Sequence, residues 1–90
     1  FAGNDMMAVG ALVAMQEAGV RIPDDVALIG FDDVPIAGLV RPALTTMRID
    51  IAQTGRRAVE RLVTLIAGDS QSDPASGAAC EVVTPRLVVR

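Results

Sequence analysis

Two adjacent carboxylates, Asp32 and Asp33, directly follow an apolar run at residues 26–31. Five of those six residues are apolar and do not alternate with polar ones, which is typical of a strand covered on both faces in a parallel sheet. The carboxylates then lie at the carboxyl end of that strand, where open α/β sheets bind their ligands. Gly30, just before them, leaves room for another part of the backbone to approach closely. The pair is therefore a candidate ligand site.

Carboxylates at a strand end can hold Mg²⁺ or accept a phosphoryl group, as in receiver domains or aspartate-based phosphatases. That chemistry needs a lysine or a similar partner for the phosphate, and the chain has no lysine. It also has no histidine, so the usual catalytic base and a Cys/His metal site are both missing. The single cysteine, Cys80, cannot form an internal disulfide. We therefore expect neither an enzyme nor a metal or cofactor site, and a reducing compartment is mildly favoured.

The 90 residues allow one small domain, and the start at Phe1 without an initiator methionine indicates a fragment of a longer protein. A net charge of -3 gives no positive surface for phosphate backbones, so this part is not expected to bind nucleic acid. No apolar run reaches the roughly 20 residues that cross a bilayer, and no signal peptide is visible.

A helix is expected from Asn4 or Asp5, as its cap, to about Ala18, with Gly19 as its exit. At 100° per residue this helix is apolar on both sides. One side carries Ala8, Ala11, Leu12 and Met15, and the other carries Met6, Val9, Gly10 and Val13. We expect one side to pack on the sheet and the other on a second subunit, although a helix wholly inside one domain would show the same pattern.

A second helix is expected from a cap at Asp50 to about Ala67. It is amphipathic, and its arginine-containing side is interpreted as a solvated face rather than a nucleic-acid recognition surface. The other expected elements are a connector at 20–25, an irregular helical turn at 34–40, a strand within 41–49, a surface loop at 68–79, and short strands at 81–84 and 87–90 separated by Pro85.

Four motifs in register closely resemble the C-terminal part of the LacI/GalR family of bacterial transcriptional repressors. They are Asn-Asp-Met-Met-Ala-x-Gly-Ala at 4–11, Gly-Val-Arg-Ile-Pro-Asp-Asp-Val-Ala-Leu-Ile-Gly-Phe-Asp-Asp at 19–33, Arg-Pro-Ala-Leu-Thr-Thr at 41–46, and Thr-Pro-Arg-Leu-Val-Val-Arg at 84–90. The resemblance covers nearly the whole chain. It implies an α/β fold, namely part of a periplasmic-binding-protein type I fold with a parallel sheet flanked by helices. Residues 1–90 would be a portion of the C-terminal lobe of the effector-binding sensor domain.

In that family an N-terminal helix-turn-helix domain, absent from this chain, binds operator DNA, and the two-lobed sensor binds an effector, usually a sugar or sugar derivative. By matching motif, Asp32 is the position that commonly hydrogen-bonds the effector, and Asn4 is a second pocket position in sugar-responsive members. Asp32 could instead cap the following turn, and Asn4 could be a plain helix cap. Asp33 is expected to support or cap the site rather than to contact the effector.

The same resemblance implies a homodimer that uses the helix after Asn-Asp and the segment after Phe-Asp-Asp, and hence Met6, Val9, Val13 and Val40. It favours a cytoplasmic regulator without a membrane partner. One alternative is a periplasmic sugar-binding protein of an ABC transporter, which shares the two lobes. Another is a structural dimerisation piece whose pocket residues are incidental.

Overall fold

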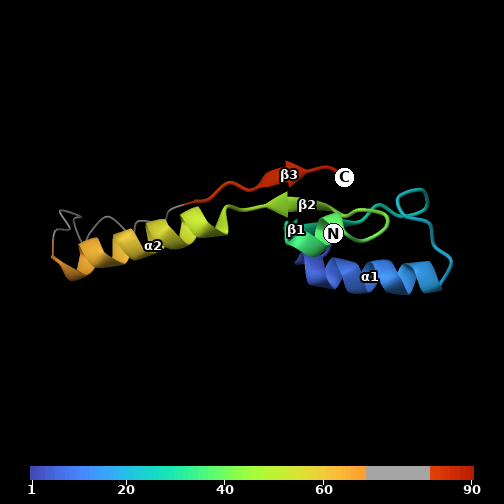
Figure 1. The fold of residues 1–90 in the computed structure, drawn as a ribbon, viewed down its shortest axis with the longest axis horizontal. Coiled ribbons are helices and arrows are strands. Elements are labelled where there is room, and N and C mark those ends of the chain that lie inside the picture. Colours follow the sequence, from blue (N-terminus) through green and yellow to red (C-terminus); the bar gives the residue numbers. More distant parts are fainter. Residues whose placement is uncertain (69–81) are drawn as a thin grey trace. The chain divides into compact units, whose positions relative to one another are not determined.

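The computed structural model describes residues 1–68 and 82–90 (Figure 1). In chain order its elements are α1 (Asp5–Glu17), β1 (Ile29–Asp32), the 3-10 helix η1 (Pro35–Gly38), β2 (Thr45–Arg48), α2 (Ile51–Ile66) and β3 (Arg86–Val88). They fall into two compact units, a first unit of Phe1–Ile49 with Pro85–Arg90 and a second unit of Asp50–Thr84. The sequence predicted an undivided piece, because no linker-like stretch marks the boundary at Asp50.

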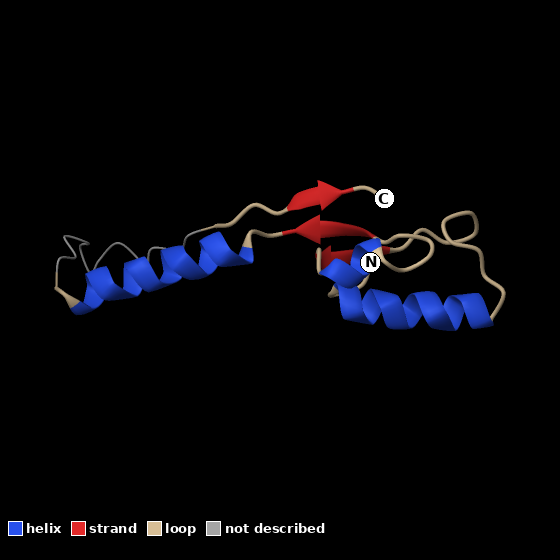
Figure 2. Ribbon diagram, viewed as in Figure 1, coloured by secondary structure: helices blue, strands red, loops and turns tan. Residues whose placement is uncertain are grey.

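The sheet belongs to the first unit and has the order β1-β2-β3 (Figure 2). β1 and β2 are parallel, with Gly30 opposite Thr46 and Asp32 opposite Arg48. The expected parallel pairing is confirmed for β1 and β2, and β3 runs antiparallel to β2, so the sheet is mixed. β1 is also shorter than the apolar run that predicted it, since residues 26–28 precede the ladder.

The helix α1 begins and ends where the sequence predicted. The Asn4 side chain accepts a hydrogen bond from the Met7 amide at its start, and Gly19 takes a positive φ of 74° just after its end. Ala8 and Leu12 are buried on the side that packs on β1, as expected. Ala8 forms the core cluster of the first unit together with Ala37 and Leu44.

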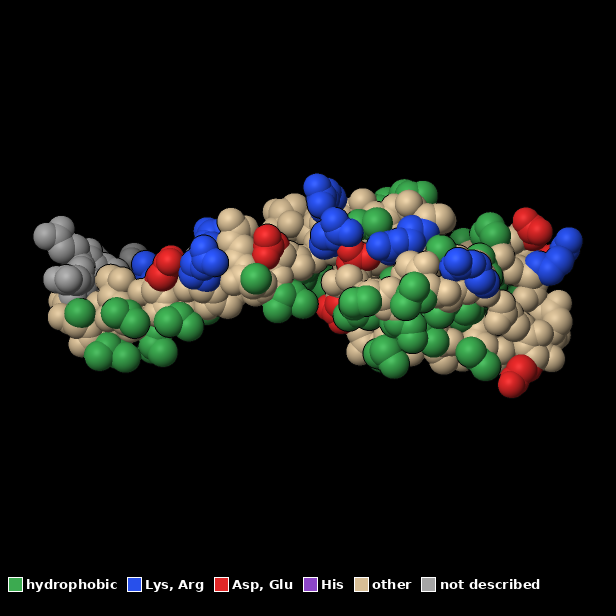
Figure 3. Space-filling view, in the orientation of Figure 1, with side chains coloured by type: hydrophobic (Ala, Val, Ile, Leu, Met, Phe, Trp, Pro, Cys, Tyr) green, Lys and Arg blue, Asp and Glu red, His purple; other side chains and the backbone are tan. Residues whose placement is uncertain are grey.

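The second unit contains α2, which Asp50 caps by accepting a hydrogen bond from the Gln53 amide, as predicted. Apolar side chains line one face of α2 and charged ones the other (Figure 3). No residue of α2 is buried by the described part of the chain. The strand predicted at 81–84 is wrong for 82–84, because β3 starts only after Pro85, which has no amide hydrogen for a ladder. Glu81 and residues 69–79 of the predicted loop lie outside the described residues.

Gly30 on β1 lies directly under the start of α1. A Cβ atom built on Gly30 would overlap Asp5 Oδ1 and would stand 3.0 Å from Leu44 Cδ2. The contact with Asp5 Oδ1 would be closer than real Cβ atoms ever show, and the contact with Leu44 Cδ2 would be tighter than most real Cβ contacts. Only a glycine therefore lets the helix approach the strand this closely. The close approach expected from the sequence is confirmed, and its partner is a carboxylate.

Gly30→Ala is expected to lower the free energy of unfolding by about 1–3 kcal/mol, because the methyl group forces the Asp5 side chain or the helix to move. Gly10 is the matched control, since a Cβ there meets nothing within 4 Å and Gly10→Ala in a helix stabilises by about 0.5–1 kcal/mol. Urea unfolding of both variants measures the difference. Equal stability of the two variants would contradict the packing described here.

Candidate functional site

The turn that follows β1 has an unusual backbone. Asp32 has a φ of 108° and Asp33 a φ of 56°, and both values lie in the positive-φ region that residues other than glycine rarely adopt. Such conformations cost roughly 1–3 kcal/mol each and persist only when the surroundings hold them. The two carboxylates therefore sit on a strained turn at the carboxyl end of a strand, where the sequence placed the candidate site.

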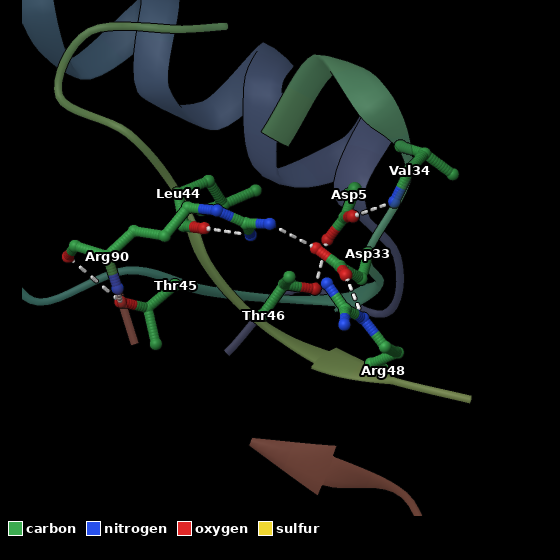
Figure 4. A network of polar contacts seen from close by, with 8 residues as sticks. All are labelled: Asp5, Asp33, Val34, Leu44, Thr45, Thr46, Arg48 and Arg90. Carbon is green, nitrogen blue, oxygen red and sulfur yellow. Dashed lines mark hydrogen bonds and ion pairs between the residues drawn. The ribbon is translucent and has the colours of Figure 1, made fainter. Parts of the chain in front are cut away.

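Two arginines hold the Asp33 side chain (Figure 4). Arg90 Nη2 lies 2.6 Å from Asp33 Oδ1, and Arg48 Nε donates to Asp33 Oδ2. Arg90 also donates to the Leu44 carbonyl at 3.1 Å, which gives its guanidinium a second anchor. The Asp33 side chain is only 4% exposed. Asp33 thus uses both of its oxygens within the chain, and its supporting role at a ligand site stays a prediction.

The pKa of the Asp33 carboxyl reflects two opposing effects. Burial raises this pKa, whereas hydrogen bonds from Arg90 and Arg48 and the positive charges of both lower it. The arginines outweigh burial, so the pKa of Asp33 lies below its ordinary value. Asp33 is therefore ionised at neutral pH, and both of its oxygens are paired with Arg48 and Arg90.

Asp5 is a site residue that sequence reasoning considered only as a helix cap. It is 1% exposed, and its carboxylate points from α1 toward the sheet and the turn (Figure 4). Its Oδ2 accepts a hydrogen bond from the Val34 amide at 2.9 Å, and its Oδ1 accepts one from the Thr46 hydroxyl at 2.5 Å. The sequence signal that could have revealed this role is the Asn4-Asp5 pair, because a helix start needs only one of the two residues as its cap.

The two predicted ligand residues lie at this same end of the first unit. The Asp32 carboxylate is partly exposed and makes no hydrogen bond or ion pair with any residue that the structure describes. Asn4 uses its Oδ1 to cap α1 at 2.8 Å from the Met7 nitrogen, and its amide nitrogen has no partner among the described residues. Both side chains thus keep hydrogen-bonding groups for a ligand, and their role as ligand residues stays a prediction.

The predicted interface residues lie on the outer side of α1 and after η1. Met6 and Val13 are 62% and 47% exposed, and Val9 is half-buried. Val40 is half-buried because it packs against the core cluster, whereas its neighbour Leu39 is 73% exposed. Figure 3 shows hydrophobic side chains gathered over α1.

An apolar hollow of about 250 Å³ lies at the other end of the strands. Leu12, Leu28 and Leu44 line it, with Ile29 and Thr45, the first residues of β1 and β2. It lacks the array of polar groups that a hydroxylated ligand needs, and it does not include the carboxylate turn.

Among residues 1–68 and 82–90, no cluster of three acidic, cysteine or histidine side chains could hold a metal ion. No helix in that part of the chain is long and apolar enough to cross a membrane.

Comparison with known proteins decides the family. The sequence pattern of the periplasmic binding protein-like domain family matches residues 1–90. The chain belongs to that family. Among relatives of this periplasmic binding protein-like domain, the lactose operon repressor of Rhizobium radiobacter is 45% identical over 71 residues, which are 79% of this chain and 63% of that protein. The regulator AscG of Escherichia coli K12 is 40% identical over 81% of this chain and 22% of its own length.

Solved structures agree. A LacI family transcriptional regulator from Arthrobacter sp. FB24 matches 98% of this domain and 32% of its own chain, with a TM-score of 0.80 and 42% identity, and it was also solved in complex with lactose. A CelR–cellobiose complex matches the whole domain and 26% of its own chain, with a TM-score of 0.88 and 32% identity.

These comparisons confirm the LacI/GalR resemblance and the α/β fold expected from the four motifs. The domain spans 63% of the first relative and about a fifth of the second. The relatives named here are transcription regulators, so the alternative of a transporter's sugar-binding protein gains no support.

Asp33→Asn is expected to lower the free energy of unfolding at pH 7 by about 1–3 kcal/mol, because two charge-assisted hydrogen bonds are weakened. The pKa of Asp33 is lower in the folded protein than its unfolded value of about 3.9. This stabilisation is therefore complete above about pH 4 and is lost as the pH falls through the folded pKa.

Urea unfolding of the wild type and Asp33→Asn at pH 7 and at steps below pH 4 measures this effect. The difference in stability should shrink with acidification. Asp24→Asn is the control, since that carboxylate is 68% exposed and lies 4.0 Å from Arg21, and it should change little at either pH. A pH-independent difference for Asp33→Asn would contradict the ion-pair description.

Proposed function

We propose that this chain is the effector-sensing and dimerising part of a LacI-type transcriptional repressor. It binds a small sugar-like ligand that modulates the affinity of the whole protein for operator DNA. The observation that carries the proposal is that the Asp32 carboxylate has no partner among the described residues. The polar groups next to it on the turn are already paired, since the Val34 amide donates to Asp5 and the Asp33 carboxylate accepts from Arg90. Ligands of open α/β sheets bind outside the carboxyl ends of the strands, and a free carboxylate there can accept hydrogen bonds from a ligand.

The chemistry of the two ligand residues suits a sugar. A carboxylate accepts hydrogen bonds from two neighbouring hydroxyls, and the Asn4 amide nitrogen donates to a hydroxyl or ring oxygen. A site built to pair with hydroxyls also discriminates strongly against ligands that lack them. Solved relatives carry such ligands, namely lactose in the Arthrobacter regulator and cellobiose in CelR.

We assign the first unit, with Asp32 and Asn4, to the C-terminal lobe of the sensor. A ligand held between this lobe and the N-terminal lobe favours one lobe arrangement, and operator affinity follows that arrangement through a DNA-binding domain outside this chain. The coupling is reciprocal, so operator DNA changes the affinity for the ligand by the same factor. The lac repressor has been solved as a dimer bound to operator and an anti-inducer. The whole protein acts in the cytoplasm, where its operator lies. The role of this chain is to bind the ligand and not to catalyse a reaction.

The dimer uses the outer side of α1, with Met6, Val9 and Val13, together with Val40 after η1. Support comes from the apolar character of this side and from its exposure in the single chain. Exposed apolar side chains that gather on one surface are typical of protein interfaces.

Asp32→Asn is expected to weaken sugar binding by about 10–100-fold, because a charged acceptor contributes about 1.5–3 kcal/mol to a hydrogen bond. Calorimetric titration of the full-length protein measures this effect with lactose, cellobiose and ONPG, a ligand bound in a solved structure of the lac repressor. Asp24→Asn is the control and should keep wild-type affinity. Binding of none of the three sugars, or equal affinity in Asp32→Asn and wild type, would refute the proposed site.

Val13→Asp in the full-length protein is expected to shift the dimer toward monomer, because the carboxylate would be desolvated inside the interface. Val26→Asp is the matched control, since Val26 is 43% exposed and lies outside the proposed surface. Sedimentation velocity over a concentration series measures both variants. An unchanged dimer in Val13→Asp would remove α1 from the interface.

A further inference from the structure

A carboxylate as buried as that of Asp5 is costly unless hydrogen bonds satisfy both of its oxygens. Here each oxygen has one donor, the Val34 amide on Oδ2 and the Thr46 hydroxyl on Oδ1. Thr46 is itself fully buried, so water does not compete for its hydroxyl. The three groups come from α1, from the segment after β1 and from β2. This carboxylate therefore fixes three separate parts of the first unit to one another.

Two of the contacts of Asp5 enclose the strained turn. Val34, which immediately follows Asp32 and Asp33, donates its amide to Oδ2. Gly30, which lies two residues before Asp32, faces Oδ1 so closely that it has no room for a Cβ. The backbone is thus held on both sides of the two residues with positive φ. Asp33 is additionally held through its own side chain by Arg48 and Arg90.

We propose that Asp5 is a positioning residue that acts through Asp32: it holds the turn in the conformation that presents the free Asp32 carboxylate to a hydroxylated ligand. This inference rests on the proposed function. Asp5 itself does not contact the ligand, because its two oxygens are occupied and its side chain is buried. A preorganised carboxylate binds more tightly than one that must be ordered by the ligand, since the cost of ordering falls on folding and not on binding.

The first experiment needs no ligand. Hydrogen exchange of the Val34 amide is followed by NMR in the full-length protein for wild type, Asp5→Ala, Asp5→Asn and Asp25→Ala. Asp5→Ala removes the acceptor and should accelerate this exchange by at least about tenfold, which is about 1.4 kcal/mol of lost protection. Asp5→Asn retains an oxygen and should give partial rescue. Asp25→Ala, which removes a carboxylate paired with Arg21, should leave Val34 exchange unchanged. Unchanged exchange in Asp5→Ala would overturn the proposal.

The second experiment is a double-mutant cycle on affinity for whichever of lactose, cellobiose and ONPG binds the wild type most tightly. Asp5→Ala alone should weaken binding about tenfold. In the Asp32→Asn background the same substitution should weaken binding less than about twofold, because the carboxylate that Asp5 positions is then absent. If Asp5→Ala does not fold, Thr46→Val replaces it, with Thr46→Ser as the rescuing variant that keeps the hydroxyl.

The outcomes separate the two proposals. Equal losses from Asp5→Ala in both backgrounds would overturn the positioning role while leaving Asp32 as a ligand residue. An Asp32→Asn protein with wild-type affinity would refute the proposed function, and the inference with it, whatever the exchange of Val34 shows. Absence of binding by all three sugars would have the same meaning. Faster exchange together with a coupled loss of affinity supports both.

Discussion

The hydrogen bonds to the Asp5 carboxylate are the constraint on which the first unit depends. A carboxyl group is tolerated at 1% exposure only because Val34 and Thr46 donate to it, so those donors must be where they are if the helix is to pack. The hydrophobic core beside it is small, with three buried apolar residues of the described chain in its cluster. Aliphatic packing brings α1 against the sheet, but the carboxylate fixes its height and register over Gly30.

The three acidic side chains at this end of the sheet show how environment assigns different roles to one chemical group. Asp5 is buried and satisfied by neutral donors, and Asp33 is buried and paired with two arginines. Asp32 has no partner in the described part of the chain. An unpaired carboxylate flanked by satisfied neighbours can accept hydrogen bonds from a ligand without first breaking an internal bond.

Local sequence signals predicted the elements well. Asn4, Asp50 and Gly19 mark helix ends through their own backbone preferences, and these were all correct. The four motifs, one of which contains Asp32, were sufficient to predict the family. The burial of Asp5 could not be predicted, because it depends on Thr46, which lies 41 residues away in the sequence. The strand at 82–84 was wrong because composition alone does not place a strand, and the ladder with β2 begins only after Pro85.

The contact between Asp5 and Gly30 also couples the two positions in evolution. A side chain at position 30 is costly while the carboxylate occupies the place of the new Cβ, so the less costly route loses the acid at position 5 first. Once a methyl group occupies that space, the reverse substitution at position 5 is blocked in turn. Thr46 and Val34 would then need new hydrogen-bond acceptors. The two positions therefore constrain the order of substitutions: a descendant with a side chain at position 30 would have to lose it before it regained the acid at position 5.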